Sequence, residues 1–140
     1  GQYIEKLIPK SIKYLTLGRK IPLHDDGSPY RNWLHASDTS KAVMTLIDNK
    51  AQNEIFNICG GFEQQNIVTV RKIVELFDNT CCPDGDDYKH HIDFSCSRPG
   101  QDVRYAIDDS KLRNLGWKPE ANFDKKLTDI VEHYRNNFVW

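Results

Sequence analysis

The sequence of 140 residues lacks any long hydrophobic stretch. None of its apolar runs approaches the roughly twenty residues that a helix needs to cross a bilayer. It also lacks a charged opening region followed by an apolar segment, which is the pattern of a secretory signal. Charge of one sign is missing too, since 19 basic and 20 acidic side chains give a formal net charge of -1. We therefore expect a soluble, cytoplasmic protein that binds neither nucleic acid nor membranes and holds any anion by local contacts.

Metal-type cysteine spacing is also absent. The cysteines form neither a C-x-x-C pattern nor a paired Cys/His pattern of the zinc type; they are Cys59, Cys81, Cys82 and Cys96. His90 and His91 follow the adjacent cysteine pair, but successive side chains of a strand point to opposite faces. The sequence therefore predicts reduced cysteines and no bound metal.

Catalytic and cofactor motifs are missing from the chain. It has no glycine-rich dinucleotide loop, no P-loop, no Tyr-x-x-x-Lys pair and no Gly-x-Ser-x-Gly elbow. His24, His35 and His133 are scattered, and an isolated histidine is more often a surface or packing residue than a base. We expect no catalytic residue and no cofactor-binding loop in these 140 residues.

Five helices are indicated by apolar residues at helical spacing. Ser37 or Asp38 is expected to cap the second helix, Asn66 the third, and Asn122 or Asp124 the last. The predicted helices are the stretch from Glu5 to Leu17, the stripe of Ala42, Val43, Leu46 and Ile47, the stripe from Ile67 to Phe77, the segment "SKLRNLGW", and the stripe from Phe123 to Phe138.

Short extended segments alternate with these helices. "KIPLHDDG" ends in an Asp-Gly turn that leads to the second extended segment, "RNWLHAS", and "HIDFSC" alternates like a strand. "EIFNICGG" has the composition of a strand and ends in two glycines, so we expect it to form the floor of a site. With no repeat or evident linker, residues 1–140 are predicted to form one mixed α/β unit that buries roughly two thirds of its unfolded surface.

Two arginines lie beside turns and suit the binding of a diphosphate. Arg31 follows "DGSPY" and Arg98 precedes Pro-Gly, and guanidinium groups grip phosphate oxygens in a bidentate way. The alternative is that each pairs with a nearby carboxylate, such as Asp26 or Asp102, at the surface. Two further residues leave similar choices: Asn57 could bind a ligand or satisfy backbone groups, and Lys6 could reach a phosphate or stay solvated.

Several stretches together resemble one known family. They are "EKLIPKSI", "GRKIPLHDDGSPYRNWLHASDTSKAV", "EIFNICGG", "SRPGQDVRYAIDDSKLRNLGWKP" and "VEHYRNNFVW". In this order and spacing they are similar to the carboxyl-terminal part of the dTDP-glucose 4,6-dehydratase family, within the extended short-chain dehydrogenase/reductases. The resemblance covers essentially the whole chain.

The resemblance implies a nucleotide-sugar binding region that packs against a Rossmann domain absent from this chain. In the family, that absent part holds NAD, the catalytic tyrosine and lysine and the acid/base carboxylates, and its helices form a homodimer. NAD takes a hydride from C4 of the glucose, water leaves across C5 and C6, and the hydride returns to C6. The chain alone is therefore expected to bind a dTDP-glucose-like nucleotide sugar without converting it.

The resemblance also assigns roles to individual residues. Arg31 and Arg98 match the arginines that hold the diphosphate, and Asn57 matches an asparagine on the nucleotide side. Tyr105 is placed near the sugar nucleotide or is simply packed. The remaining matches are Lys6 and Leu7 at the nucleotide, Pro22, Leu23 and His24 in the base pocket, and Gln101 where the family usually carries a histidine.

Three departures from the family pattern leave the preferred base open between thymidine and uridine. His24 replaces a tyrosine, Asn32 replaces an aspartate and Gln101 replaces a histidine. Two other interpretations also stay open: a fragment of a related UDP-sugar epimerase or decarboxylase, and a stand-alone noncatalytic module that binds nucleotide sugars or a protein.

Overall fold

The computed structural model describes residues 2–78 and 86–137, with the side chain of residue 86 left out. Its α-helices are α1 (Leu7–Thr16), α2 (Ala36–Asp48), α3 (Asn66–Asp78), α4 (Ser110–Arg113) and α5 (Phe123–Asn136). Its strands are β1 (Ile21–Pro22), β2 (Tyr30–Trp33), β3 (Phe62–Gln65) and β4 (Ile92–Asp93), and two 3-10 helices are η1 (His24–Gly27) and η2 (Asp86–His91). The predicted α/β class is confirmed.

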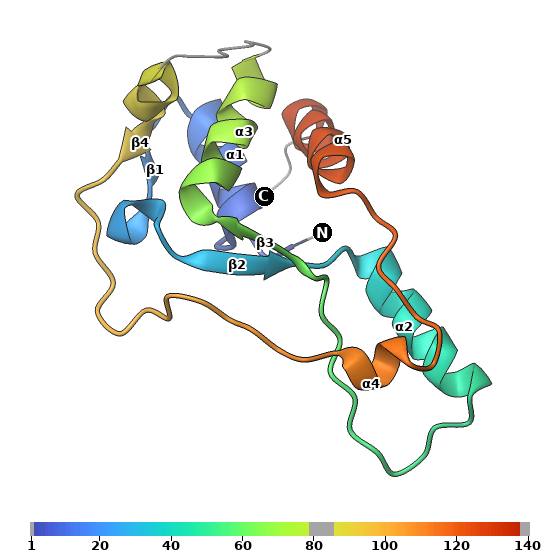
Figure 1. Ribbon diagram of the computed structural model, residues 1–140. Coiled ribbons are helices and arrows are strands. Elements are labelled where there is room, and N and C mark those ends of the chain that lie inside the picture. The colour runs from blue at the N-terminus through green and yellow to red at the C-terminus, as the bar shows by residue number, and fades with distance from the viewer. Residues whose placement is uncertain (1, 79–85, 138–140) are drawn as a thin grey trace.

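The main core lies among α1, α3 and α5, which Figure 1 shows grouped on one side of the strands. These helices form because their apolar residues recur at helical spacing and face one another. Ile12 of α1, Ile73 of α3 and Leu127 of α5 are almost completely buried there. The predicted stripes of the first, third and last helices are therefore confirmed within the described residues, while Phe138 lies outside them.

A second, smaller core joins α2 to α4 at the other end of the molecule (Figure 1). Its buried residues are Ala42, Leu112 and Trp117, with Phe56 and Ile58 packed against them. The predicted stripe of α2 is only partly buried, because Val43 and Ile47 are exposed. One face of α2 thus has no apolar cover among the described residues.

Strands pair over long sequence distances. β2 pairs antiparallel with β3, with Arg31 opposite Gln64, and β1 pairs in parallel with β4. The two extended segments expected near residues 20 and 31 are much shorter than predicted, because the chain between them turns through η1. Asp25 and Asp26 there have φ values of 50° and 53°, so the backbone passes through left-handed conformations before β2 begins.

The strand prediction for "EIFNICGG" is wrong. Residues 54–61 form no strand, and β3 begins only at Phe62. The stretch has strand composition, but a strand also needs a hydrogen-bonded neighbour, and no segment of the described residues pairs with it. A Cβ at Gly60 would overlap the Trp33 carbonyl oxygen, so this glycine permits backbone packing.

The helix starts can be compared with the predicted caps. α2 begins at Ala36, and its cap is His35, whose Nδ1 accepts from the Ser37 backbone N–H at 3.2 Å. The prediction of Ser37 or Asp38 was therefore wrong by two or three residues. Asn122 caps α5 as predicted, since its side-chain oxygen accepts from the Lys125 backbone N–H at 2.9 Å.

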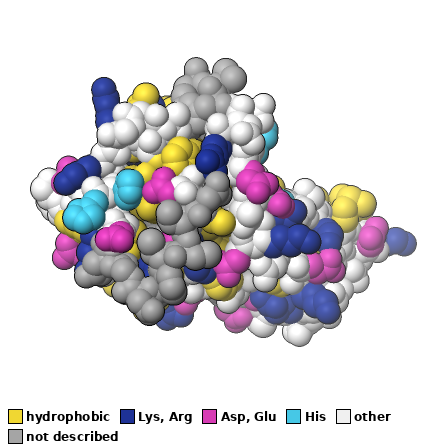
Figure 2. All heavy atoms as spheres, turned by 90° about the horizontal axis from the view of Figure 1, so that it is seen from above, with side chains coloured by type: hydrophobic (Ala, Val, Ile, Leu, Met, Phe, Trp, Pro, Cys, Tyr) yellow, Lys and Arg dark blue, Asp and Glu magenta, His cyan; other side chains and the backbone are white. Residues whose placement is uncertain are grey.

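Surface charge is mixed. Figure 2 shows basic and acidic side chains interspersed over one face of the molecule. No helix in residues 2–78 and 86–137 is long and apolar enough to cross a membrane.

Candidate functional site

Arg31 is held on β2 by backbone groups and an aromatic ring. Its Nη1 donates to the carbonyl oxygens of Tyr30 at 2.7 Å and of Asp102 at 3.1 Å. The Tyr105 ring covers its guanidinium face, with Cζ 4.8 Å from the ring centre. Because the Tyr30 backbone N–H also donates to the Val103 carbonyl at 2.8 Å, residues 102–105 are fastened along β2.

The expected carboxylate partners do not neutralise Arg31. Within the described residues Arg31 forms no ion pair, and it contacts the carbonyl of Asp102 rather than its carboxylate. Its Nε and Nη2 donors have no protein partner among those residues. This is the edge with which a guanidinium makes two parallel hydrogen bonds to an anion.

Arg104, on the same segment as Tyr105, behaves in the opposite way. Its Nε and Nη2 donate to the Glu63 carboxylate at 2.9 and 2.6 Å. The hydrogen bond to Glu63 raises the pKa of Arg104 above its usual value. Arg104 is therefore an arginine neutralised by a carboxylate, whereas Arg31 has no carboxylate partner among the described residues.

Arg98 lies where the chain turns toward this segment. Its carbonyl accepts from the Gln101 backbone N–H at 3.2 Å, and Gly100 adopts a φ of 74° within the turn. The Arg98 side chain is exposed and forms no ion pair with the described residues. Its charge acts on Tyr105 together with that of Arg31, so both predicted diphosphate arginines influence the same phenol.

Asp102 links these groups, and sequence reasoning considered it only as a counter-ion. A hydrogen bond with the Asp102 carboxylate raises the pKa of Tyr105, and the two arginine charges oppose this shift. Asp102 thus accepts from Arg31 through its carbonyl, and its carboxylate raises the pKa of Tyr105. The spacing Asp102-x-x-Tyr105 was the available sequence signal.

Asn57 is exposed rather than buried, and its Nδ2 donates to the Asp108 carbonyl at 2.9 Å. This contact matches the expectation that its amide satisfies backbone groups, while the amide oxygen faces no described partner. The bond ties the stretch before β3 to the end of the segment that carries Arg98 and Tyr105. Asn57 is thereby joined to Asp108, three residues after Tyr105 in the sequence.

The remaining predicted residues lie at α1, around β1 and, for Gln101, in the turn after Arg98. Lys6 is exposed immediately before α1, and Leu7 is half-buried against the main core. Leu23 is buried in that core, so its side chain is committed to packing. Pro22 closes β1, Gln101 is half-buried, and His24 has a buried Nδ1 without a partner among the described residues.

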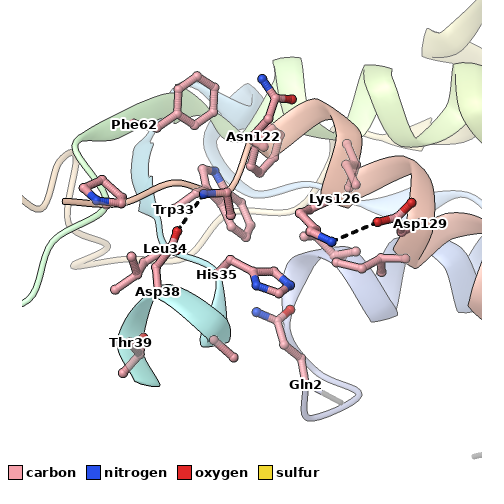
Figure 3. A pocket seen from close by; sticks show the side chains of 18 of the residues that line it. Gln2, Trp33, Leu34, His35, Asp38, Thr39, Phe62, Asn122, Lys126 and Asp129 are labelled. Atoms are coloured by element: carbon pink, nitrogen blue, oxygen red, sulfur yellow. Dashed lines mark hydrogen bonds and ion pairs between the residues drawn. The ribbon is translucent and has the colours of Figure 1, made fainter. Parts of the chain in front are cut away.

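A cavity of about 760 Å³ lies elsewhere, between α5 and the residues that follow β2. Figure 3 shows Trp33, Phe62, His35 and Lys126 around it. The cavity wall contains no residue of the predicted binding site. Its apolar side is built by Phe123, whose ring centre lies 5.4 Å from that of Trp33 and 4.9 Å from that of Phe62.

Metal and cofactor features are sparse among the described residues. No group of three or more His, Cys, Asp or Glu side chains there could hold a metal ion. Cys59 and Cys96 are free thiols, whereas Cys81 and Cys82 lie outside the described residues. Gly60 packs against the Trp33 backbone.

The fold defines an α/β unit, and comparison with known proteins identifies its family. A family profile described as GDP-mannose 4,6 dehydratase matches residues 1–130, and the chain belongs to this family. The chain is 37% identical over 137 residues to dTDP-glucose 4,6-dehydratase 1 of Escherichia coli K12, covering 97% of this chain and 38% of that protein. The resemblance inferred from the sequence is thereby confirmed.

Solved structures agree with this assignment. The crystal structure of dTDP-glucose 4,6-dehydratase from Bacillus anthracis in complex with NAD has a TM-score of 0.83 and 34% identity, covering 99% of this chain and 42% of that chain. DesIV, a dTDP-glucose 4,6-dehydratase from Streptomyces venezuelae with NAD and TYD bound, has a TM-score of 0.82 and 30% identity, covering 97% and 40%. The chain thus spans about two fifths of the length of the proteins that it matches.

Proposed function

We propose that the chain is the nucleotide-sugar binding region of an NAD-dependent dTDP-glucose 4,6-dehydratase. The observation that carries the proposal is the state of Arg31. It is fixed by two carbonyls and one aromatic ring, and its Nε/Nη2 edge has no partner among the described residues. A cation held in this way suits a diphosphate, whereas an arginine that stabilises the fold alone would resemble Arg104 with its carboxylate partner.

Arg31 and Arg98 are proposed to grip the diphosphate from two segments of the chain. Both charges act on Tyr105, which supports their lying on one side of the fold. Asn57, whose Nδ2 is bound to the Asp108 carbonyl, would offer its amide oxygen to the nucleotide. The other proposed nucleotide contacts are Lys6, Leu7, Pro22, His24 and Gln101, with Leu23 contributing its backbone and its packing to the base pocket.

Binding alone does not supply the chemistry. The sequence carries no glycine-rich dinucleotide loop and no Tyr-x-x-x-Lys pair, so we derive no reaction step from this chain. We propose that a Rossmann domain of the same cytoplasmic protein supplies NAD and the catalytic groups, and that it mediates a homodimer. The relatives are more than twice as long as this chain, and the uncovered face of α2 offers a surface for the additional domain.

Calorimetric titration of dTDP into the complete gene product tests the binding assignment. A charge-assisted hydrogen bond contributes roughly 1.5 to 3 kcal/mol, so Arg31→Ala and Arg98→Ala should each weaken binding about tenfold or more. Lysine at either position should restore only part of the affinity, because the planar fork is lost. Arg104→Ala is the matched control, since it removes the same charge from a guanidinium that Glu63 already occupies.

One outcome of these titrations would contradict the proposal. Unchanged affinity in the Arg31 and Arg98 variants, with a loss in Arg104→Ala, would show that the clamp is not the binding site. Parallel titrations with UDP would choose between thymidine and uridine. The stand-alone alternative is tested by reading the gene before Gly1 for a glycine-rich strand-turn-helix and a Tyr-x-x-x-Lys pair.

A further inference from the structure

We propose that Tyr105 is a positioning residue, which holds the Arg31 guanidinium with its Nε/Nη2 edge turned outward, rather than a residue that contacts the nucleotide itself. This inference rests on the proposed function, because it takes Arg31 to be a diphosphate ligand. It departs from the expectation drawn from the family resemblance, in which Tyr105 lies near the sugar nucleotide or is simply packed.

Three groups contact the Arg31 guanidinium in the structure: two backbone carbonyls and one aromatic ring. The two donors of Nη1 face the carbonyls of Tyr30 and Asp102. The Tyr105 ring covers one face at 4.8 Å, a distance at which a cation is attracted to an aromatic ring. A guanidinium has five donors, so the three on Nε and Nη2 remain, and they form the edge that suits a phosphate.

Asp102 contacts Arg31 without neutralising its charge. The Asp102 carboxylate acts on Tyr105 by raising the pKa of its phenol. Arg31 receives only the Asp102 carbonyl, and that contact leaves its positive charge without a counter-ion. The Asp102 backbone therefore binds Arg31 on one side, and the Tyr105 ring stacks on its guanidinium face.

The Tyr105 phenol is neutral at neutral pH, as tyrosine ordinarily is. The interaction with Asp102 raises its pKa further, above the ordinary value for tyrosine. A neutral ring also avoids a direct ion pair with Arg31, which would compete with an incoming diphosphate.

Positioning matters because a half-buried arginine without such support samples many rotamers. Ordering a rotamer-rich side chain opposes binding, and a side chain that is already ordered avoids this cost. Tyr105 would therefore increase affinity without touching the ligand. Its effect must disappear when Arg31 is removed, which separates this inference from a direct contact.

A double-mutant cycle in the complete gene product tests this dependence, with dTDP binding measured by calorimetry. Tyr105→Leu is expected to weaken binding about threefold to fivefold in the wild-type background, from the strength of an exposed cation–π contact. In the Arg31→Ala background, the same substitution should change the affinity by less than about 1.5-fold. Tyr105→Phe keeps the ring and should retain most of the affinity. Val103→Ala, on the same segment with an exposed side chain, is the control.

A second readout keeps the inference testable where a double variant folds poorly. Relaxation of the Arg31 Nε–H group, measured by NMR in the ligand-free protein, should show an ordered side chain in the wild type and in Tyr105→Phe. Tyr105→Leu should make that group more mobile, and Val103→Ala should not. Unchanged mobility in Tyr105→Leu would overturn the positioning role.

The outcomes also separate this inference from the proposed function. Equal losses from Tyr105→Leu in both backgrounds would mean that Tyr105 contacts the ligand directly, which overturns the inference and leaves the clamp intact. If Tyr105→Leu leaves the affinity unchanged while Arg31→Ala lowers it strongly, the inference is again overturned and the clamp remains. No loss from Arg31→Ala would instead overturn the proposed function on which the inference rests.

Discussion

The two ends of the molecule differ in how completely their apolar side chains are buried. Around α1, α3 and α5, residues such as Ile12 and Ile73 are fully buried on all sides. Around α2, by contrast, Met44 and Ile47 are 54% and 61% exposed, and Ile55 in the following stretch is 87% exposed. The first end makes a core from its own helices, whereas the second presents an apolar layer that the described residues leave uncovered. This contrast supports the proposal that another domain packs at the α2 end.

The proposed binding edge lies between these two ends. Residues 98–108 leave β4, run along β2 through the bond between Tyr30 and Val103, and reach α4. Arg31 is therefore mounted on a strand that the main core supports, while Asn57 approaches from the α2 end through Asp108. A ligand held by both residues would depend on how firmly the two ends are joined.

The largest expected effect comes from making the same substitution at each end. Ile12→Ala should lower the free energy of unfolding by about 2 to 5 kcal/mol, because it opens a cavity among buried side chains. Ile47→Ala removes the same atoms from an exposed position and should change stability by no more than about 0.5 kcal/mol. Urea denaturation of the 140-residue chain measures both, and equal losses would contradict the contrast between the ends.

The junction between the ends should be sensitive to one methyl group. Gly60→Ala would drive a Cβ into the Trp33 carbonyl oxygen, so the backbone must shift, at a cost of about 1 to 3 kcal/mol. Gly18→Ala is a useful comparison, since a Cβ there meets nothing within 4 Å but suffers from a φ of 60°. Thermal unfolding of the two variants separates steric overlap from backbone strain, and an unaffected Gly60→Ala would show that the close approach relaxes freely.

The loss of stability caused by Ile47→Ala should depend on whether another domain is present. If another domain covers α2, the substitution should lower the stability of the complete gene product by about 1 to 3 kcal/mol, the contribution of a newly buried side chain. The 140-residue chain should show no comparable loss. Denaturation of both proteins with and without the substitution gives the answer, and identical small effects in both would mean that nothing covers this face.

The sequence predicted the helices well because each carries its own signal. Apolar spacing placed α1, α3 and α5, and Asn122 was recognised as the cap of α5 because its side chain bonds locally. The cap of α2 was missed because a histidine ring, through Nδ1 of His35, replaces the usual hydroxyl or carboxylate. Local chemistry is readable from sequence when the residue type is a common one.

Strands were predicted less well because pairing is a long-range property. "EIFNICGG" has the composition of a strand, yet Ile55 is exposed and the segment has no partner among the described residues. The pairing of β1 with β4 joins residues about seventy positions apart, which no local pattern reveals. For the same reason, Arg31 and Arg98 could be named from their turns and the family resemblance, whereas the bridging role of Asp102 required the structure.

The smallest expected effect concerns the turn that leads into α4 at the less complete end. The Asp108 carboxylate accepts from the Ser110 backbone N–H at 2.8 Å, and this bond, followed by that of the Ser110 hydroxyl, lowers the pKa of Asp108. A lowered pKa in the folded state means that the charged carboxylate stabilises the fold above the unfolded pKa of about 3.9, and that this contribution is lost as the pH falls through the folded pKa. Asp108→Ala should therefore be slightly less stable than the wild type at pH 6, with a gap that narrows toward pH 2. Asp108→Asn keeps an acceptor without the charge and should differ from Asp108→Ala by an amount that does not vary with pH. Melting temperatures across this range test the prediction, and a gap that widens on acidification would contradict it.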